Sequence, residues 1–339
     1  MADKLNKPLL IGIGTTFDYT LPLEPMCRMI ADAGFRAITI GGGDIAHSGY
    51  DAESGRRTLL GSVGRSGLRI DSIHAPFGPE ADLSVPDVRT EMPALLASAA
   101  GPGVHSEVAA VQPPAAQEPP GASSEPHEPR LSASRYSYSP DDRRVQAIAK
   151  TKMAVDAAAG LGSGIVIVHP CDRFPAEETR ARISAAKDSL RQLVRYAAER
   201  NIRLALENLA SPLSMQVFEA VLEHVPELGV CYDTSHAQIA GDTFGIMARH
   251  ADRIIAVHLS DNRGANDDHM LPFEGVLPWE EFAYYLPRLK NLGCFMLEVE
   301  IRESSFKDRG EFLVEAFRRA RQVLDLIPAD RRPSRTRAR

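Results

Sequence analysis

Ionisable side chains recur in this sequence at the ends of short apolar segments. Six successive segments end on, or one residue after, a residue of a type that binds metal ions: His74, His169, Glu207, Asp233, His258 and Glu298. Gathering so many ionisable groups is costly unless something compensates their charge. The pattern therefore predicts a metal centre, although any one of these residues alone would more often be an ordinary hydrogen-bonding side chain.

The charges of the set indicate which metals it would suit. Glu207, Asp233, His258 and Glu298 together offer three carboxylates and one imidazole. Such an oxygen-rich set favours a hard or borderline divalent ion such as Mn²⁺, Mg²⁺ or Co²⁺, and Zn²⁺ is a further candidate. Four protein ligands leave about two positions open in an octahedral ion, enough for neighbouring oxygens of a substrate.

A second tier of residues brings the number of potential ligands to nine: His74, His169, His236, Asp267 and His269. His236 lies three residues after Asp233 in the segment DTSH, and Asp267 and His269 lie in the segment that follows His258. Glu300 has the same strand parity as Glu298, so either could be the ligand. Its position in the motif favours Glu298.

The segments that carry these residues alternate with helical patterns. Eight β-rich segments are expected at 9–14, 37–40, 68–74, 164–169, 202–207, 228–233, 254–258 and 294–299. Helical stretches such as 23–34, 184–200 and 310–327 have apolar residues at three- and four-residue spacing. Eight βα units predict an α/β fold with a parallel sheet, and favour a closed (β/α)8 barrel over an open sheet. All strand ends then meet at one face of the barrel, where an active site forms.

One segment interrupts this alternation. Residues 97–140 are rich in Pro, Ala, Ser, Gly and Glu and fall inside the third βα unit, which predicts a disordered insertion in a single catalytic domain spanning 1–330. The tail 331–339 carries five Arg and no acid. It is expected to be a solvated end, although such a tail could also touch nucleic acid.

The overall composition excludes several classes of protein. With 339 residues, 44% of them hydrophobic and 25% charged, the chain has the values of an ordinary soluble domain. No apolar run approaches the roughly 18 residues that a membrane span needs, and residues 1–17 resemble a first strand more than a signal peptide. We therefore expect a cytoplasmic protein with no membrane partner. The four cysteines form no CxxC pair, which argues against a disulfide framework or a cysteine zinc site.

The order of short motifs resembles that of a known superfamily. These motifs are HAPF (74–77), VHP (168–170), LEN (206–208), DTSH (233–236), HLSDN (258–262), DDH (267–269) with FEG (273–275), and LEVE (297–300). Together they resemble the xylose-isomerase-like TIM-barrel superfamily over nearly the whole chain except the insertion and the tail. That superfamily contains sugar-phosphate isomerases and epimerases, keto-inositol dehydratases and type IV apurinic-site endonucleases.

The resemblance to the epimerases implies a role for each residue. One divalent ion would be held by Glu207, Asp233, His258 and Glu298. Glu207 and Glu298 would also act as the acid/base pair that moves a proton on a carbon next to a carbonyl, through an enediolate that the ion stabilises. His236 would contact a substrate oxygen.

Two further residues are candidates for substrate binding. Asn208 directly follows Glu207, so its amide could contact the substrate or support a neighbouring ligand. Arg302 could bind an anionic group such as a phosphate, or could be an ordinary solvated side chain.

The resemblance to the endonucleases implies a different use of the same residues, in which all nine positions hold three zinc ions. The ligands alone do not decide between the two chemistries. Without the five Arg of the tail the net charge of −6 becomes −11, and the segments after His74 and at 41–57 contain few bases, which disfavours nucleic acid as a partner.

We therefore expect a metal-dependent isomerase or epimerase of a small sugar, keto-sugar or polyol. The alternatives are a three-zinc phosphodiesterase like the type IV AP endonucleases, a dehydratase of an inosose-type ketone, and a barrel that has lost catalysis. The expected partner is a small carbohydrate substrate. A homo-oligomer is compatible with such a barrel, but no segment predicts an interface.

Overall fold

Eight short parallel strands form the centre of the molecule. The computed structural model describes residues 9–86 and 140–328. The strands are β1 (Leu10–Gly14), β2 (Ala37–Ile40), β3 (Arg69–His74), β4 (Ile165–Val168), β5 (Arg203–Glu207), β6 (Gly229–Asp233), β7 (Ile254–His258) and β8 (Cys294–Leu297). Each lies within a predicted segment and differs from it by at most two residues at either end, because buried apolar runs are a strong strand signal.

The sheet closes into a barrel. Its strands are hydrogen-bonded in the order β7-β6-β5-β4-β3-β2-β1-β8, and every pair is parallel. Leu259, directly after β7, bridges to Leu297 of β8; its N–H donates to Met296 at 3.0 Å and its carbonyl accepts from the Glu298 N–H at 3.0 Å. The predicted (β/α)8 barrel is confirmed.

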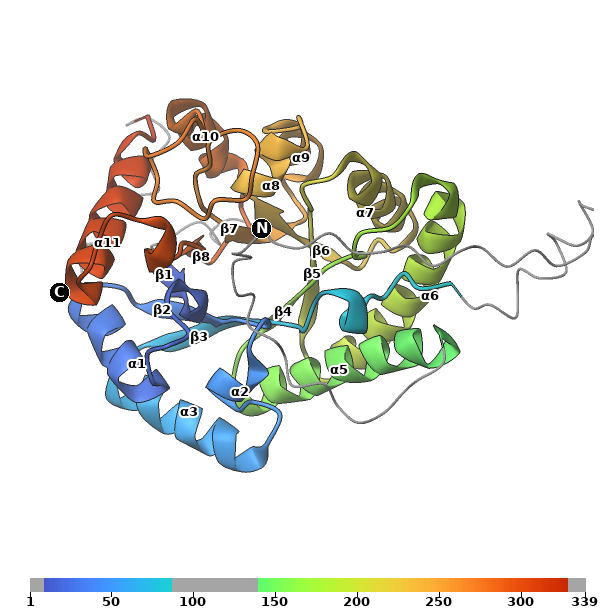
Figure 1. Cartoon of the computed structure of the whole chain (residues 1–339), viewed down its shortest axis with the longest axis horizontal. Helices are drawn as coiled ribbons and strands as arrows, with labels where there is room; N and C mark the ends of the chain where they lie inside the picture. Colours follow the sequence, from blue (N-terminus) through green and yellow to red (C-terminus); the bar gives the residue numbers. More distant parts are fainter. Residues whose placement is uncertain (1–8, 87–139, 329–339) are drawn as a thin grey trace, which may run out of the picture.

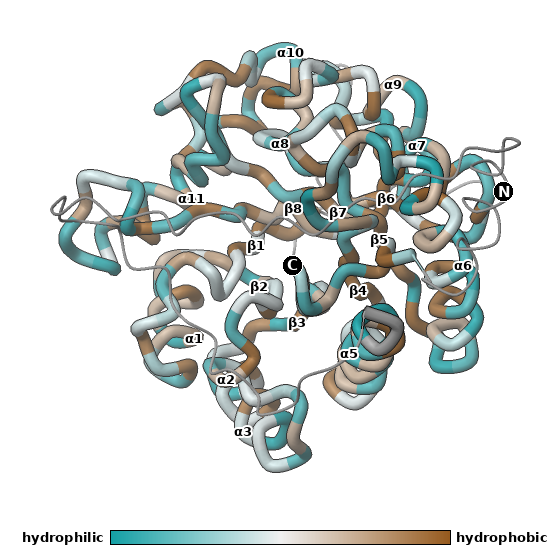
Figure 2. Tube along the Cα trace, turned by 45° about the vertical axis from the view of Figure 1, so that its right-hand side comes forward, coloured by the Kyte–Doolittle hydropathy of each residue, from teal (hydrophilic) through white to brown (hydrophobic). Residues whose placement is uncertain are grey.

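Helices surround the strands on the outside (Figure 1). They are α1 (Leu23–Asp32), α2 (Ile45–Ser48), α3 (Glu53–Arg65), α5 (Pro140–Leu161), α6 (Thr179–Ala198), α7 (Pro212–His224), α8 (Thr234–Ile239), α9 (Gly245–His250), α10 (Trp279–Tyr285) and α11 (Arg309–Asp325). Short 3-10 turns are η1 (Thr15–Phe17), η2 (Pro79–Ala81), η3 (Ala176–Glu178), η4 (Leu286–Arg288) and η5 (Ile301–Glu303). Apolar residues concentrate in the central strands, while the helices carry polar residues as well (Figure 2).

Local sequence signals account for several helix boundaries. Helix α7 begins where the Ser211 hydroxyl accepts from the Ser214 N–H at 3.0 Å, with Pro212 at the first helical position. Helix α6 starts five residues before its predicted segment. The guanidinium of Arg182 holds this extra turn, because it binds Glu178 at 2.8 Å and Asp82 at 2.6 Å.

Two predicted segments cannot be compared with the structure. The insertion at 97–140 lies outside the described residues except for Pro140, where α5 begins, and the tail 331–339 lies outside them entirely. Among the described residues, no helix is long and apolar enough to cross a membrane.

An aromatic cluster anchors α10 to the barrel. The Phe282 ring, fully buried, lies 5.6 Å from Trp279, 6.4 Å from Tyr232 of β6 and 6.3 Å from Phe295 of β8, measured between ring centroids. This contact holds the chain between β7 and β8, which carries Asp267 and His269, against the strands whose ends bear candidate ligands.

Truncating this ring should destabilise the barrel. Phe282→Ala removes a buried ring from a packed interior, so the free energy of unfolding should fall by about 3–5 kcal/mol in urea denaturation. Val314→Ala on α11, whose side chain is 58% exposed, is the control and should change it by less than about 0.5 kcal/mol. Equal effects of the two changes would contradict the assigned packing.

Candidate metal centre

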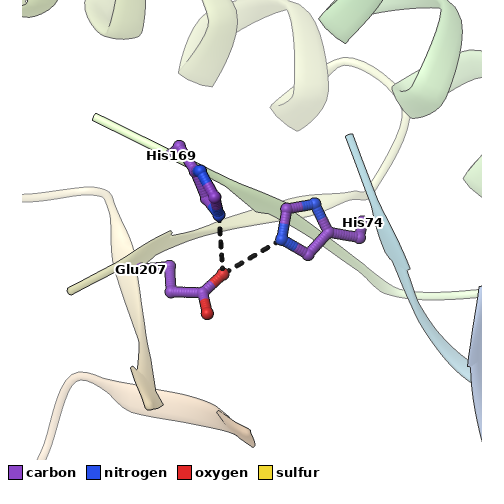
Figure 3. A group of neighbouring side chains, drawn as sticks. All are labelled: His74, His169 and Glu207. Atoms are coloured by element: carbon purple, nitrogen blue, oxygen red, sulfur yellow. Dashed lines mark hydrogen bonds and ion pairs between the residues drawn. The ribbon is translucent and has the colours of Figure 1, made fainter. Parts of the chain in front are cut away.

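The Glu207 carboxylate lies at the centre of the barrel mouth. It is the last residue of β5 and is 1% exposed. Its Oε2 lies 3.1 Å from Nε2 of His74, at the end of β3, and 3.4 Å from Nε2 of His169, directly after β4 (Figure 3). Its Oε1 lies 2.9 Å from Nδ1 of His258, at the end of β7. Imidazoles from three strands therefore surround one buried carboxylate.

The four residues predicted to hold one ion come together. One ligand atom from each of Glu207, Asp233, His258 and Glu298 lies within 4.8 Å of the others. Asp233 pairs with His258 across β6 and β7, and His258 Nδ1 lies 2.9 Å from Glu298 Oε2. We name these four residues the upper set.

Unpaired atoms in the upper set show that it fits a cation. Among the described residues, Asp233 Oδ2 is buried without a hydrogen-bond partner; His258 Nε2 is also without one, but it is Nδ1 of this ring that lies 2.9 Å from Glu207 and from Glu298. Such atoms are rare in native proteins because each loses its hydration without compensation. Three carboxylates and an imidazole are donors that suit a divalent ion, which would also offset the charge they bury.

The electrostatics of the ion-free site show how strongly these groups interact. Burial alone would raise the pKa of Glu207, but the charge of His258 and the hydrogen bonds from the histidines outweigh it and hold the pKa well below its usual range. Burial raises the pKa of Asp233 to about 7, against the charge of His236 and with the help of Asp267. Burial would lower the pKa of His258, but its interactions with Cys231, Glu207 and Glu298 raise it well above the usual value.

The remaining predicted ligands form a third group beside the upper set. Oδ2 of Asp267 lies 3.1 Å from Nε2 of His236 and 3.0 Å from Nε2 of His269. His269 has a φ of 46°, which is uncommon for a residue other than glycine, and a hydrogen bond of 3.1 Å joins its Nδ1 to the Glu298 carbonyl. His236 Nδ1 lies 3.8 Å from Glu207 Oε1. All nine predicted ligands therefore gather at one mouth.

The two predicted substrate-binding residues differ in their surroundings. The Asn208 amide is fully buried and binds the backbone of Asp233 twice, accepting from its N–H at 2.9 Å and donating to its carbonyl at 3.0 Å. In this position it aligns the ends of β5 and β6. The Arg302 side chain is 69% exposed and pairs with Glu300 and Glu303. Glu300 lies outside the upper set, which contains Glu298.

A cavity of about 110 Å³ opens beside the upper set. Much of its wall consists of residues with no metal-binding side chain, which the motifs of the sequence did not predict as site residues: Thr16, Tyr19, Gly41, Gly42, Gly43, Phe77 and Met296. A Cβ on Gly42 would lie 2.3 Å from the Ala75 carbonyl oxygen, so only glycine permits this approach of two backbones. The run GGG after the second strand was the available signal, since three glycines after a strand often mark such an approach.

Comparison with known proteins agrees with this architecture. Residues 120–323 match the model of the xylose isomerase-like TIM barrel family. The chain belongs to this family.

Solved structures of the same fold cover nearly all of the chain. A D-tagatose 3-epimerase-like protein is 18% identical, with a TM-score of 0.64, covering 94% of this chain and 98% of its own. D-psicose 3-epimerase from Clostridium cellulolyticum H10 is 14% identical, with a TM-score of 0.61 and the same coverage. 3-Keto-D-glucoside 4-epimerase YcjR from E. coli is 15% identical, with a TM-score of 0.60, covering 93% of this chain and all of its own. At these identities the likeness shows the fold.

Two curated relatives are similar in sequence over part of their length. The uncharacterized protein y4fM from Sinorhizobium fredii is 31% identical over 150 residues, which are 41% of this chain and 48% of that protein. The uncharacterized protein MJ1311 from Methanocaldococcus jannaschii is 29% identical over 160 residues, which are 41% of this chain and 51% of that protein. The chain spans about half the length of the curated relatives it matches.

Metal binding by the upper set should depend on pH. Asp233, with a pKa of about 7, and His258, with a raised pKa, hold protons that they must lose to bind an ion. The apparent affinity for Mn²⁺ should therefore rise between pH 6 and pH 8, by about tenfold per pH unit for each group that is still protonated. Asp233 contributes mainly below about pH 7, and His258 contributes across the whole range. Calorimetric titration in buffers of different ionisation enthalpy measures both the Mn²⁺ affinity and the number of protons released.

The control for this titration is His250→Gln, because His250 binds Glu219 on α7, away from the upper set. This variant should keep the slope of the wild type. A Mn²⁺ affinity that stays constant from pH 6 to pH 8 would contradict the protonation states assigned to Asp233 and His258.

Proposed function

We propose that this protein is a divalent-metal-dependent isomerase or epimerase of a small sugar, keto-sugar or polyol. The observation that carries the proposal is the upper set at the barrel mouth, in which two carboxylates, Glu207 and Glu298, each lie 2.9 Å from Nδ1 of His258. The sugar epimerases of the same fold support it. The proposed catalytic domain is residues 1–330, with the insertion at 97–140.

In the proposed reaction the two glutamates transfer protons to and from carbon. A divalent ion, when bound, would polarise the substrate carbonyl and so acidify the neighbouring C–H. One carboxylate takes that proton, which leaves an enediolate, and a carboxylate then returns a proton to carbon. Return to the opposite face of the same carbon gives the epimer, and return to the former carbonyl carbon gives the isomer. Two bases at one site permit either outcome.

Three features beside the upper set fit a small hydroxylated substrate. Thr16 Oγ1 lines the cavity side of η1 and is buried without a partner among the described residues, so a substrate hydroxyl could bind it. The Phe77 ring is 44% exposed at the mouth and stacks on His169 at 4.9 Å, offering an apolar face to the C–H side of a sugar. His236 lies on the Glu207 side, where it could contact a substrate oxygen.

Removing either base should stop proton exchange with carbon. Glu207→Gln and Glu298→Gln keep the side-chain volume but lose the base, so both should slow deuterium exchange from ²H₂O into ketopentoses and ketohexoses by at least about 100-fold. Mass spectrometry of the sugar measures the exchange, with Mn²⁺ saturating. Substantial exchange by either variant would refute the assignment of its carboxylate.

Glu303→Gln is the matched control for this experiment. Glu303 is a glutamate on the same end of the barrel, but its side chain is 40% exposed and pairs with Arg302. Its exchange rate should equal that of the wild type. A product that carries deuterium but has lost water would identify a dehydratase of a keto-polyol, because that reaction shares the first step.

A three-zinc phosphodiesterase is the second candidate. The observation that favours it is the group formed by His74, His169 and Glu207, whose ligand atoms lie within 4.8 Å of one another beside the upper set. The Asp267 carboxylate shared by His236 and His269 offers a third position. The two candidates use the same residues and differ in the number of ions.

Metal content separates the two candidates. Mass spectrometry of protein purified without chelator should find about one exchangeable divalent ion per chain, and no nicking of abasic DNA. Close to three tightly held zinc ions, together with nicking that His236→Ala and His269→Ala abolish, would establish the phosphodiesterase instead.

A further inference from the structure

A cysteine lies directly beneath the carboxylates of the barrel mouth. Cys231 is two residues before Asp233 on β6 and is the register partner of Glu207 on β5. It is fully buried in an apolar floor with Ile165, Ile167, Ala205, Ile255 and Ala256. Its surroundings are those of a small buried apolar residue.

The cysteine is also close enough to share ligands with the upper set. One ligand atom from each of Cys231, Glu207 and His258 lies within 4.8 Å of the others. We name these three residues the lower set. His258 is 1% exposed, and its Nε2 has no hydrogen-bond partner among the described residues. The lower set thus combines a thiol, a carboxylate and an imidazole with one nitrogen that has no hydrogen-bond partner, in a fully buried part of the barrel.

We propose that the lower set is a second, alternative site for a soft divalent ion such as Cd²⁺ or Zn²⁺. Thiolate and imidazole ligands prefer such ions, whereas Mg²⁺ and Mn²⁺ prefer the oxygens of the upper set. Binding forms a metal–sulfur bond and breaks the S–H bond of Cys231, and this proton and the one that His258 must lose to become a ligand both pass to solvent. No oxidant or reductant takes part.

The two sets share Glu207 and His258, so two cations bound at once would lie close together and repel each other. We therefore expect an ion in the lower set to weaken Mn²⁺ binding in the upper set. It also engages the Glu207 carboxylate, which the proposed function needs as a base. The consequence is competitive inhibition of metal loading by soft ions, through a residue that contacts neither the substrate nor the hard ion.

The two sets can be distinguished by crossed variants that have a spectroscopic readout. Titration of the metal-free wild type with Cd²⁺ should produce an ultraviolet thiolate-to-cadmium absorption band, and the free-Mn²⁺ signal in electron paramagnetic resonance should rise as Mn²⁺ is displaced. Cys231→Ser should abolish the band and lower the Cd²⁺ affinity by about tenfold or more, while Mn²⁺ affinity changes much less. Asp233→Asn should lower the Mn²⁺ affinity while the absorption band and the Cd²⁺ affinity change much less, because Asp233 belongs to the upper set alone.

Cys294→Ser is the matched control, because Cys294 is a buried cysteine of β8 that packs with Ala37 and Met296, outside both sets. The thiolate-to-cadmium absorption band of Cys294→Ser should equal that of the wild type. Absence of a band in the wild type, or a band that persists in Cys231→Ser, would overturn the lower set. Circular dichroism and thermal unfolding confirm that each variant is folded. Because the readout is metal binding, failure of the proposed isomerase activity would leave this result unaffected.

Discussion

The burial of one ionised carboxylate, that of Glu207, is the constraint on which the site depends. Removing a carboxylate from water is costly, and the cost is offset only where partners of opposite charge or good hydrogen bonds replace the lost hydration. Here His74, His169 and His258 supply them from three different strands. The pKa of Glu207 stays low for that reason, and the group remains an acceptor for a metal ion or for a proton.

Barrel closure provides the geometry that makes this compensation possible. Parallel strands bring all their C-terminal ends to one face, so side chains more than a hundred residues apart in the sequence meet without any long connection. The bridge between Leu259 and Leu297 completes the ring next to Glu298. The double hydrogen bond of Asn208 to Asp233 then aligns adjacent strand ends. Positioning of the ligands thus depends on backbone contacts as much as on the ligands themselves.

The same ligands are compatible with several chemistries, because Glu207 and His258 take part in more than one candidate group. Which ion binds depends on the third and fourth ligands, and the hardness of those ligands decides the preference. The cavity at the mouth is lined by Tyr19, Phe77 and the glycines at 41–43 together with His258 and Glu298 of the upper set. A small molecule in this cavity would therefore lie against the upper set.

The eight strands, the barrel and the ionisable residues at the strand ends could be predicted from the sequence alone, because apolar runs and the polar residues that end them are local properties of the chain. Strand parity is the same for Glu298 and Glu300, and the sequence favoured Glu298 only by its position in the motif. In the tertiary structure Glu298 joins the upper set, because it directly follows the end of β8 at Leu297. The Glu300 N–H donates to the His269 carbonyl, and the Glu300 carboxylate pairs with Arg302 instead. The cavity and the lower set likewise emerged only in three dimensions. Both are built from contacts across the barrel, and no spacing along the chain reports which side chains meet there.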